Sequence, residues 1–245
     1  MTINPRIAAL VLAIAGLTQP AFAEPPLRCG HFTRDVLAKP EPRENPFPVR
    51  RGELINTNIR SQPYRMLLLG DSLTERWDPA LWRDHMAARG VLNAGVSGDR
   101  TEHLLWRLDH GNLAGPVPQA VIVLIGTNDL GHGRSPEVAA EGVRAILVKL
   151  RERLPNTRIV LLGLLPREEA PNAWLRQQVN AVNRLIQTCG DNQAVFYADI
   201  GGTLLDGQGR LTRGMAPDQL HFSAAGYARL APTLDRLIDA LPVAR

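Results

Sequence analysis

Several polar residues of this chain stand directly after apolar runs, where they could form a hydrolytic site. Ser72 lies in the segment Gly70-Asp71-Ser72-Leu73, which follows the apolar residues 66–69. A serine on such a strand-to-helix turn exposes its hydroxyl as a nucleophile, and its amide can stabilise a negatively charged oxygen near a helix N-terminus. Taken alone the segment is a weak signal, because Asp and Ser are also common helix N-caps.

Two further segments supply hydrogen-bond donors of the kind that stabilise an oxyanion. Gly98 follows a second apolar run, in a glycine-containing segment that lets the backbone approach a ligand closely. Asn128 follows a third apolar run, and its side-chain amide is a neutral donor suited to the same task. Each segment also fits an ordinary turn, so the inference depends on their combination.

An acid–base pair stands near the C-terminus. Asp218 precedes His221 by three residues, a spacing at which the carboxylate can reach the imidazole, fix its tautomer and stabilise its protonated form. The other ring nitrogen of His221 would then face Ser72. A nucleophile, two further oxyanion donors and an acid–base pair form the set that a serine hydrolase requires, and this chemistry needs no metal or cofactor.

The apolar runs that precede these residues predict a parallel sheet. They are short and rich in branched residues, as buried parallel strands are, and they alternate with helical segments. We expect strands at residues 66–69, 91–94, 120–125, 158–164 and 194–198, and helices at residues 81–89, 101–108, 135–154, 172–188 and 224–241. This alternation predicts an α/β fold with both sheet faces covered, and a site at the carboxyl ends of the strands.

These motifs resemble those of the SGNH hydrolases, the GDSL esterase/lipase superfamily. Residues 70–73 match its first block, Gly98 falls in the second, residues 126–129 are the third and residues 218–221 the fifth. Within the superfamily the chain is most similar to the α subunits of platelet-activating-factor acetylhydrolase, over roughly residues 64–241. The resemblance implies a flavodoxin-like three-layer α/β/α sandwich with a five-stranded parallel sheet.

The resemblance also implies roles for individual residues. It makes Ser72 the nucleophile, His221 the general base and then the general acid, and Asp218 the residue that orients His221. Asp71 is expected to shape the turn rather than to join the proton relay. The other implied site residues are the oxyanion donors, namely the amides of Ser72 and Gly98 and the side chain of Asn128, and the residues bordering the acyl pocket, Thr127 and Leu220.

The first part of the chain has the features of an export signal. Arg6 precedes an apolar run at residues 7–17, and residues 21–23 have the A-x-A form of a signal-peptidase site. A membrane anchor is the alternative, but the run is shorter than the roughly 20 residues that span a bilayer. We expect three parts: a signal peptide at residues 1–23, a proline-rich N-terminal arm at 24–63 and the hydrolase domain at 64–245.

The proline-rich arm is expected to be loop-like, because prolines interrupt any regular period. At most, a short helix is predicted within residues 52–60. Export to the periplasm or out of the cell would permit a disulfide between Cys29 and Cys189, the two cysteines of the chain. The sequence leaves open whether they pair, because their distance cannot be inferred from it.

Charge and composition argue against a nucleic-acid partner. The chain has 28 Lys and Arg against 24 Asp and Glu, a net charge of +4 over 245 residues despite a pI near 9.6. The longest basic run is the doublet Arg50-Arg51, whereas phosphate-tracking surfaces are clustered patches. No membrane span is expected once the signal peptide has been removed.

The expected function is that of an exported serine esterase. It would hydrolyse short acyl, chiefly acetyl, carboxylic esters through an acyl-serine intermediate. Acetylated glycans and lysophospholipids are the substrate classes that fit an exported enzyme. An acyltransferase that uses the same acyl-serine and a non-catalytic glycan- or lipid-binding domain are the alternatives, and the sequence leaves the oligomeric state open.

Overall fold

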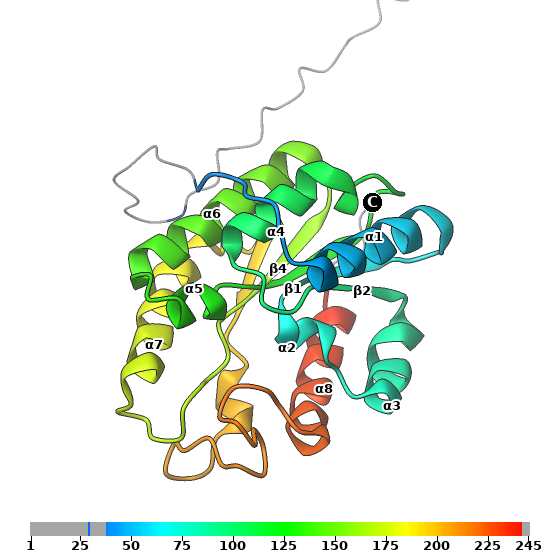
Figure 1. The fold of residues 1–245 in the computed structure, drawn as a ribbon. Coiled ribbons are helices and arrows are strands. Elements are labelled where there is room, and N and C mark those ends of the chain that lie inside the picture. Colours follow the sequence, from blue (N-terminus) through cyan, green and yellow to red (C-terminus); the bar gives the residue numbers. More distant parts are fainter. Residues whose placement is uncertain (1–28, 30–37, 242–245) are drawn as a thin grey trace, which may run out of the picture.

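The computed structural model describes Cys29 and residues 38–241. The predicted signal peptide and part of the predicted arm lie outside these residues. Five parallel strands form one sheet in the order β2-β1-β3-β4-β5 (Figure 1). They are β1 (Met66–Gly70), β2 (Val91–Gly95), β3 (Ala120–Leu124), β4 (Arg158–Leu162) and β5 (Val195–Ala198). The predicted parallel α/β sheet is confirmed, although β4 ends two residues sooner than expected.

Four helices cover one face of the sheet. They are α1 (Pro46–Ser61), α4 (Thr101–Arg107), α6 (Pro136–Arg153) and α7 (Trp174–Ile186). Leu67 and Leu69 of β1 belong to the apolar cluster on this face, together with Ile146 of α6 and Val182 of α7. Because successive side chains of a strand point to opposite faces, the intervening residues of β1 are directed to the other side.

The opposite face packs mainly against the last helix, α8 (Ala224–Asp239). Met66 and Leu68 share the second apolar cluster with Leu230 and Leu234 of α8. The short elements α2 (Ser72–Glu75), α3 (Pro79–Leu81), the π-helical turn Trp82–Met86 and the 3-10 turn Ala87–Arg89 lie between β1 and β2, where one helix over residues 81–89 was predicted. Helices on both faces complete the predicted three-layer α/β/α sandwich.

Helix α1 corrects the expectation that the arm is loop-like with at most a short helix. It has 16 residues, and its start is capped by the Asn45 side chain, which accepts a hydrogen bond from the Phe47 amide at 3.0 Å. Pro46 occupies the first turn, where backbone N–H groups have no acceptor within the helix, so the N–H that proline lacks is not needed. Ile55 and Ile59, four residues apart, are fully buried against the sheet. Proline at this position therefore starts a helix and does not prevent one.

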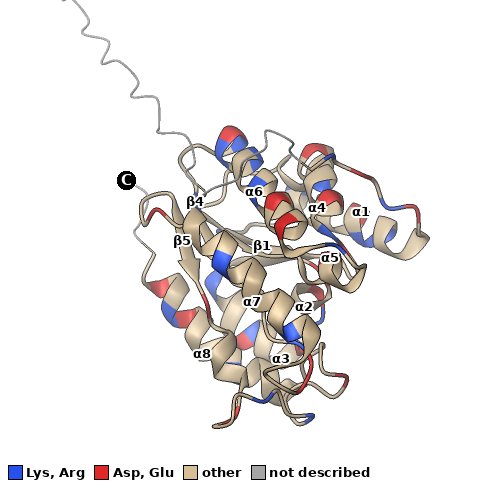
Figure 2. Cartoon of the chain, turned by 90° about the vertical axis from the view of Figure 1, so that its left-hand side faces the viewer, with Lys and Arg blue, Asp and Glu red and all other residues tan. Residues whose placement is uncertain are grey.

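Charged side chains of both signs are interspersed along the surface helices, as α6 and α8 show in Figure 2. On α6, for example, Glu141 and Arg144 form an ion pair at 2.6 Å. None of the helices formed by the described residues is long and apolar enough to cross a membrane.

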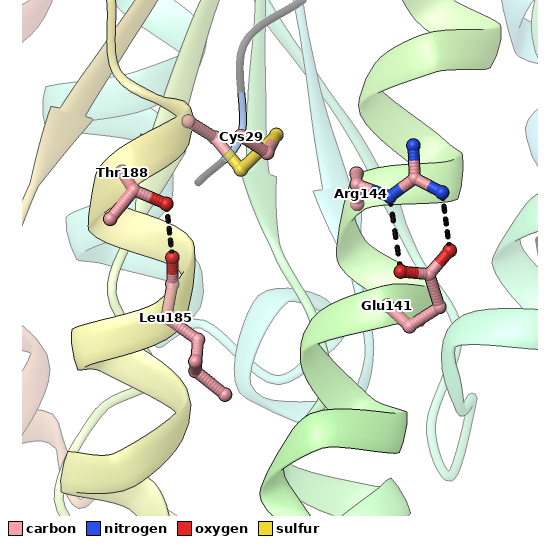
Figure 3. The surroundings of a disulfide bond; sticks show 6 residues. Cys29, Glu141, Arg144, Leu185 and Thr188 are labelled. Carbon is pink, nitrogen blue, oxygen red and sulfur yellow. Dashed lines mark hydrogen bonds and ion pairs between the residues drawn. A yellow bond between two sulfur atoms is a disulfide. The ribbon is translucent and has the colours of Figure 1, made fainter. Parts of the chain in front are cut away.

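Cys29 and Cys189 form a disulfide, which the sequence had left open (Figure 3). Cys189 ends the short turn Gln187–Cys189 that follows α7, and both cysteines are buried. In the same turn the Thr188 hydroxyl donates to the carbonyl of Leu185 at 2.7 Å. Strand β5 packs beside the turn Gln187–Cys189, so the disulfide joins the arm to the β5 edge of the sheet.

Candidate active site

The candidate site lies at the carboxyl ends of β1, β2 and β3, and glycines there allow the elements to approach closely. Gly70 ends β1 and is paired with Gly95 at the end of β2. A Cβ on Gly70 would lie 2.5 Å from the carbonyl oxygen of Leu124, and one on Gly95 would lie 2.5 Å from the amide nitrogen of Glu75. Helix α2, which begins at Ser72, can therefore start directly against both strands.

Ser72, His221 and Asp218 form one hydrogen-bonded chain, as their predicted roles require. The Ser72 hydroxyl lies 2.9 Å from Nε2 of His221, and Nδ1 of His221 lies 2.7 Å from Oδ2 of Asp218. Ser72 comes from the end of β1, whereas the other two residues lie 149 and 146 positions later, in the loop before α8. The fold thus brings the two ends of the domain together at this site.

A tight turn holds the Asp218 carboxylate in place. Its Oδ1 accepts hydrogen bonds from the amides of Leu220, at 3.0 Å, and His221, at 2.7 Å, and the intervening Gln219 has a left-handed φ of 65°. Burial disfavours the charged form, but these amides and the His221 side chain outweigh it and lower the pKa of Asp218 to about 2. The ionised carboxylate accepts a hydrogen bond from Nδ1–H of His221, which leaves Nε2 as the acceptor for the Ser72 hydroxyl.

The three predicted oxyanion donors are available for a ligand. Within the described part of the chain, the amides of Ser72 and Gly98 have no hydrogen-bond acceptor. The Asn128 side chain donates from Nδ2 to the carbonyl of Asp99 at 2.9 Å, so one of its two amide protons is used and the other is left over. Asn128 lies in α5 (Thr127–Gly131), the short helix that follows β3.

Asp71 caps α2, and its carboxylate forms no hydrogen bond with His221 or the Ser72 hydroxyl in the described part of the chain. Its Oδ1 accepts a hydrogen bond from the Leu73 amide at 2.9 Å, and its Oδ2 is buried without a hydrogen-bond partner. Burial, with smaller contributions from Asp99 and Asp129, raises the pKa of Asp71 to about 7 in spite of that bond. This geometry agrees with the predicted turn-shaping role.

The two predicted acyl-pocket residues lie next to the donors and the acid–base pair. Thr127 is buried at the beginning of α5, directly before Asn128. Leu220 is half-buried beside His221 and packs against the apolar cluster under α8. Their position fits the predicted pocket, and their contact with an acyl group remains a prediction.

Arginines that the sequence interpretation did not assign to the site hold the backbone around it. Arg107 is buried and donates to the carbonyl oxygens of Ala94 at 3.2 Å and Gly70 at 3.3 Å, and to the Asp99 carboxylate at 2.8 Å. It therefore ties the ends of β1 and β2 together below the donors. A buried guanidinium needs hydrogen-bond acceptors, and here the carbonyl oxygens at the strand ends supply them.

Arg167 and Arg43 act on the other two donor loops. Arg167 donates to the carbonyl oxygen of Thr127 at 3.0 Å, across the peptide that leads into Asn128. Arg43, from the segment before α1, donates to the carbonyl oxygen of Gly98 at 2.6 Å. No sequence pattern indicates the contact of Arg43, because its partner lies 55 residues away.

The structure also has a cavity away from the predicted site residues. The cavity, of about 300 Å³, lies near the carboxyl ends of β4 and β5, lined among others by Leu164, Arg176 and Asp199. None of the predicted site residues lines it.

Among Cys29 and residues 38–241, no three His, Cys, Asp or Glu side chains gather in a way that could hold a metal ion.

Comparison with known proteins gives consistent matches. The model of the GDSL-like lipase/acylhydrolase family matches residues 68–229. Platelet-activating factor acetylhydrolase IB subunit alpha2 of Rattus norvegicus is 36% identical over 175 residues, which are 71% of this chain and 75% of that protein.

Solved structures match over most of their length. A GDSL-like lipase of Bacteroides thetaiotaomicron aligns with a TM-score of 0.65 at 19% identity, covering 78% of this chain and 96% of that one. An acetylxylan esterase of Geobacillus stearothermophilus aligns with a TM-score of 0.57 at 19% identity, covering 77% and 99%. At these identities, the structures show a shared fold.

Proposed function

The chain belongs to the GDSL-like lipase/acylhydrolase family and is a carboxylic ester hydrolase; from this premise we propose that it is an exported serine esterase for short acyl, chiefly acetyl, esters. The observation that carries the proposal is the hydrogen-bonded chain from Ser72 through His221 to Asp218, at 2.9 and 2.7 Å, beside three oxyanion donors. This arrangement can activate a hydroxyl and stabilise the tetrahedral intermediate of acyl transfer.

The proposed reaction has two steps. The Ser72 oxygen attacks the ester carbonyl while Nε2 of His221 takes its proton, and the amides of Ser72 and Gly98 and the Asn128 side chain bind the oxyanion. The C–O bond to the alcohol breaks, and the alcohol leaves with the proton from His221. A water molecule then gives one proton to His221 and attacks the acyl carbon; the bond to the Ser72 oxygen breaks, the acid leaves, and His221 returns the proton to Ser72.

The preference for short acyl groups is supported by the site and by the relatives. Thr127 directly precedes the proposed donor Asn128, and Leu220 directly precedes His221, so both are candidates to border the acyl group. The matched relative is, by its name, an acetylhydrolase, and a protein of the same fold is an acetylxylan esterase. An acetyl ester of a glycan or a lysophospholipid would place a small acyl group in the site and leave the large alcohol outside.

The proposed export is supported by the N-terminal sequence and by the disulfide. Residues 1–23 have the pattern of a signal peptide, and structural disulfides such as Cys29–Cys189 form in oxidising compartments. Expression of the full chain in a bacterial host, followed by fractionation and mass spectrometry of its N-terminus, tests this. We expect a mature protein that begins at Glu24 in the periplasm or medium; an uncleaved protein in the cytoplasm would contradict export.

The esterase activity is tested with p-nitrophenyl esters of increasing acyl length, using wild type beside Ser72→Ala. We expect the wild type to prefer the acetate, and the variant to lose nearly all activity because the acyl-serine cannot form. Equal activity in the two proteins would refute the assignment of Ser72. A rate that rises with chain length would refute the short acyl preference.

A further inference from the structure

We propose that Arg43 is a positioning residue of the esterase: it holds Gly98 in the conformation in which the Gly98 amide can bind the oxyanion. Arg43 lies before α1, outside residues 68–229 that match the family model. The inference rests on the proposed oxyanion role of Gly98 and adds to it a residue from the N-terminal arm.

The contact between Arg43 and Gly98 is short and specific. Nη1 of Arg43 donates to the carbonyl oxygen of Gly98 at 2.6 Å. The guanidinium also lies against the Cα of Gly98, because a Cβ built there would be 3.3 Å from Nη2 of Arg43. Gly98 has a φ of 78°, a left-handed conformation that glycine adopts without a steric penalty. Arg43 therefore contacts the residue whose backbone has the greatest freedom in this loop.

The neighbouring peptide groups of the loop are also held, and the Gly98 amide is the exception. The amide of Ser97 donates to the Glu75 carboxylate at 2.5 Å, and the amide of Asp99 donates to the carbonyl of Val96 at 3.1 Å. Arg43 binds the Gly98 carbonyl, which belongs to the same peptide as the Asp99 amide. The peptide that follows Gly98 is thus held at its carbonyl oxygen and at its amide, next to the N–H of Gly98 that would face an oxyanion.

The groups around Arg43 favour this contact. His103 lies on α4 with Nδ1 at 3.4 Å from Nη1 of Arg43, and the same Nδ1 accepts a hydrogen bond from the Arg100 amide at 3.1 Å. Burial, with the nearby arginines, lowers the pKa of His103 to about 4, so Arg43 faces a neutral ring at neutral pH. The Asp99 carboxylate also attracts Arg43, although its main partner is Arg107.

The arm itself is anchored on both sides of Arg43. The Glu41 amide donates to the carbonyl of Glu102 on α4 at 3.2 Å. On α1, Arg51 donates to the carbonyl oxygens of Gly95 and Asn93, each at 3.1 Å, at the end of β2. The backbone that carries Arg43 is therefore held in place, so the Arg43 side chain can hold the Gly98 loop in a fixed position.

The test compares Arg43→Ala, Arg43→Lys and wild type in the full chain, with p-nitrophenyl acetate as substrate. We expect Arg43→Ala to lower kcat about ten- to a hundredfold, the range for a misplaced catalytic donor, and to leave KM nearly unchanged. Arg43→Lys should be intermediate, and added guanidinium ion should restore part of the kcat of Arg43→Ala. Arg50→Ala is the matched control, because Arg50 lies exposed on α1 over the Phe47 ring, 4.8 Å from its centre.

Affinity for a tetrahedral adduct separates positioning from a general loss of stability. A trifluoromethyl ketone places an oxyanion in the site, so its affinity should fall in parallel with kcat/KM in Arg43→Ala and stay unchanged in Arg50→Ala. A kcat of Arg43→Ala within twofold of wild type would overturn the proposal, as would a lower kcat with full affinity for the ketone. If the wild type hydrolysed no ester, the proposed function itself would fail. The role of Arg43 would then be tested by comparing the ketone affinity of Arg43→Ala with that of wild type alone.

Discussion

Two aspartates beside Ser72 and His221 have pKa values shifted in opposite directions. Asp218 accepts three hydrogen bonds at the surface, and its pKa falls to about 2, so it is ionised at any working pH. Asp71 is fully buried with one partner, and its pKa rises to about 7. The carboxylate that supports the imidazole and the carboxyl group that caps α2 are therefore distinguished by hydrogen bonds and burial rather than by residue type.

Asp71→Asn is expected to change how stability depends on pH. A carboxyl group whose pKa rises from 3.8 to about 7 on folding stabilises the protein fully below pH 3.8 and loses this contribution as pH rises through about 7. The neutral variant lacks this titration, so the unfolding free energy of wild type should fall relative to it over that interval, by on the order of 4 kcal/mol. Urea unfolding of both proteins at a series of pH values measures this; parallel curves would contradict it.

Asn128→Ala tests the proposed role of Asn128 as the side-chain donor to the oxyanion. The substitution removes the amide proton left over after the bond to Asp99, and the loss of one such donor typically lowers kcat about a hundred- to a thousandfold. KM should change far less, because the donor acts on the tetrahedral oxyanion rather than on the ground-state ester. Steady-state kinetics with p-nitrophenyl acetate measure both constants, and an unchanged kcat would remove Asn128 from the site.

At the scale of elements, the site depends on how closely α2 packs on the strand ends. Gly70 and Gly95 lie side by side in the sheet, and each faces backbone or the Thr74 side chain where a Cβ would be. Arg107 from α4 binds the carbonyl oxygens just behind them. The turn that carries Ser72 is thus held between two strands and a buried guanidinium.

Gly70→Ala is expected to destabilise the protein and disturb the nucleophile turn. The added Cβ would meet the Leu124 carbonyl oxygen at 2.5 Å as well as the Thr74 hydroxyl, and overpacking of this kind costs about 1–3 kcal/mol. The matched control is Gly207→Ala, since no atom lies within 4 Å of the position of its Cβ. Thermal unfolding and acetate hydrolysis of both variants measure the effect; equal melting temperatures would show that the strand ends can separate without cost.

At the scale of the whole molecule, the N-terminal arm is attached at opposite edges of the sheet. Cys29 is joined to Cys189, beside the edge strand β5, whereas α1 packs beside the other edge strand, β2. The bond links residues 160 positions apart. Cross-linking such distant residues restricts the unfolded chain and stabilises the folded one.

Loss of the disulfide is expected to lower the unfolding free energy by about 2–5 kcal/mol, the range for native disulfides. The variant with both Cys29→Ser and Cys189→Ser should unfold at lower denaturant concentration than wild type. Addition of a reductant should shift wild type to the same midpoint and leave the double variant unaffected. A reductant that leaves the midpoint of wild type unchanged would show that the bond contributes nothing measurable.

The sequence by itself determined the parallel sheet, most of the helices that cover it and the residue types expected at its carboxyl edge. Apolar runs such as 120–124 are long enough and branched enough to form buried strands, and the polar residues that follow them must then lie at the carboxyl edge. The spacing of Asp218 and His221 is local, so their pairing was also readable. Only a short helix within residues 52–60 was predicted where α1 has 16 residues, because Pro46 was interpreted as a breaker although it occupies the first turn.

Only the tertiary structure decided which distant residues support that site. The disulfide between Cys29 and Cys189 and the bond from Arg43 to Gly98 join residues 160 and 55 positions apart. No periodicity or motif in the sequence indicates such contacts, because they depend on how whole elements pack against one another. The pKa values of Asp71 and Asp218 likewise follow from burial and hydrogen bonds, which exist only once the chain has folded.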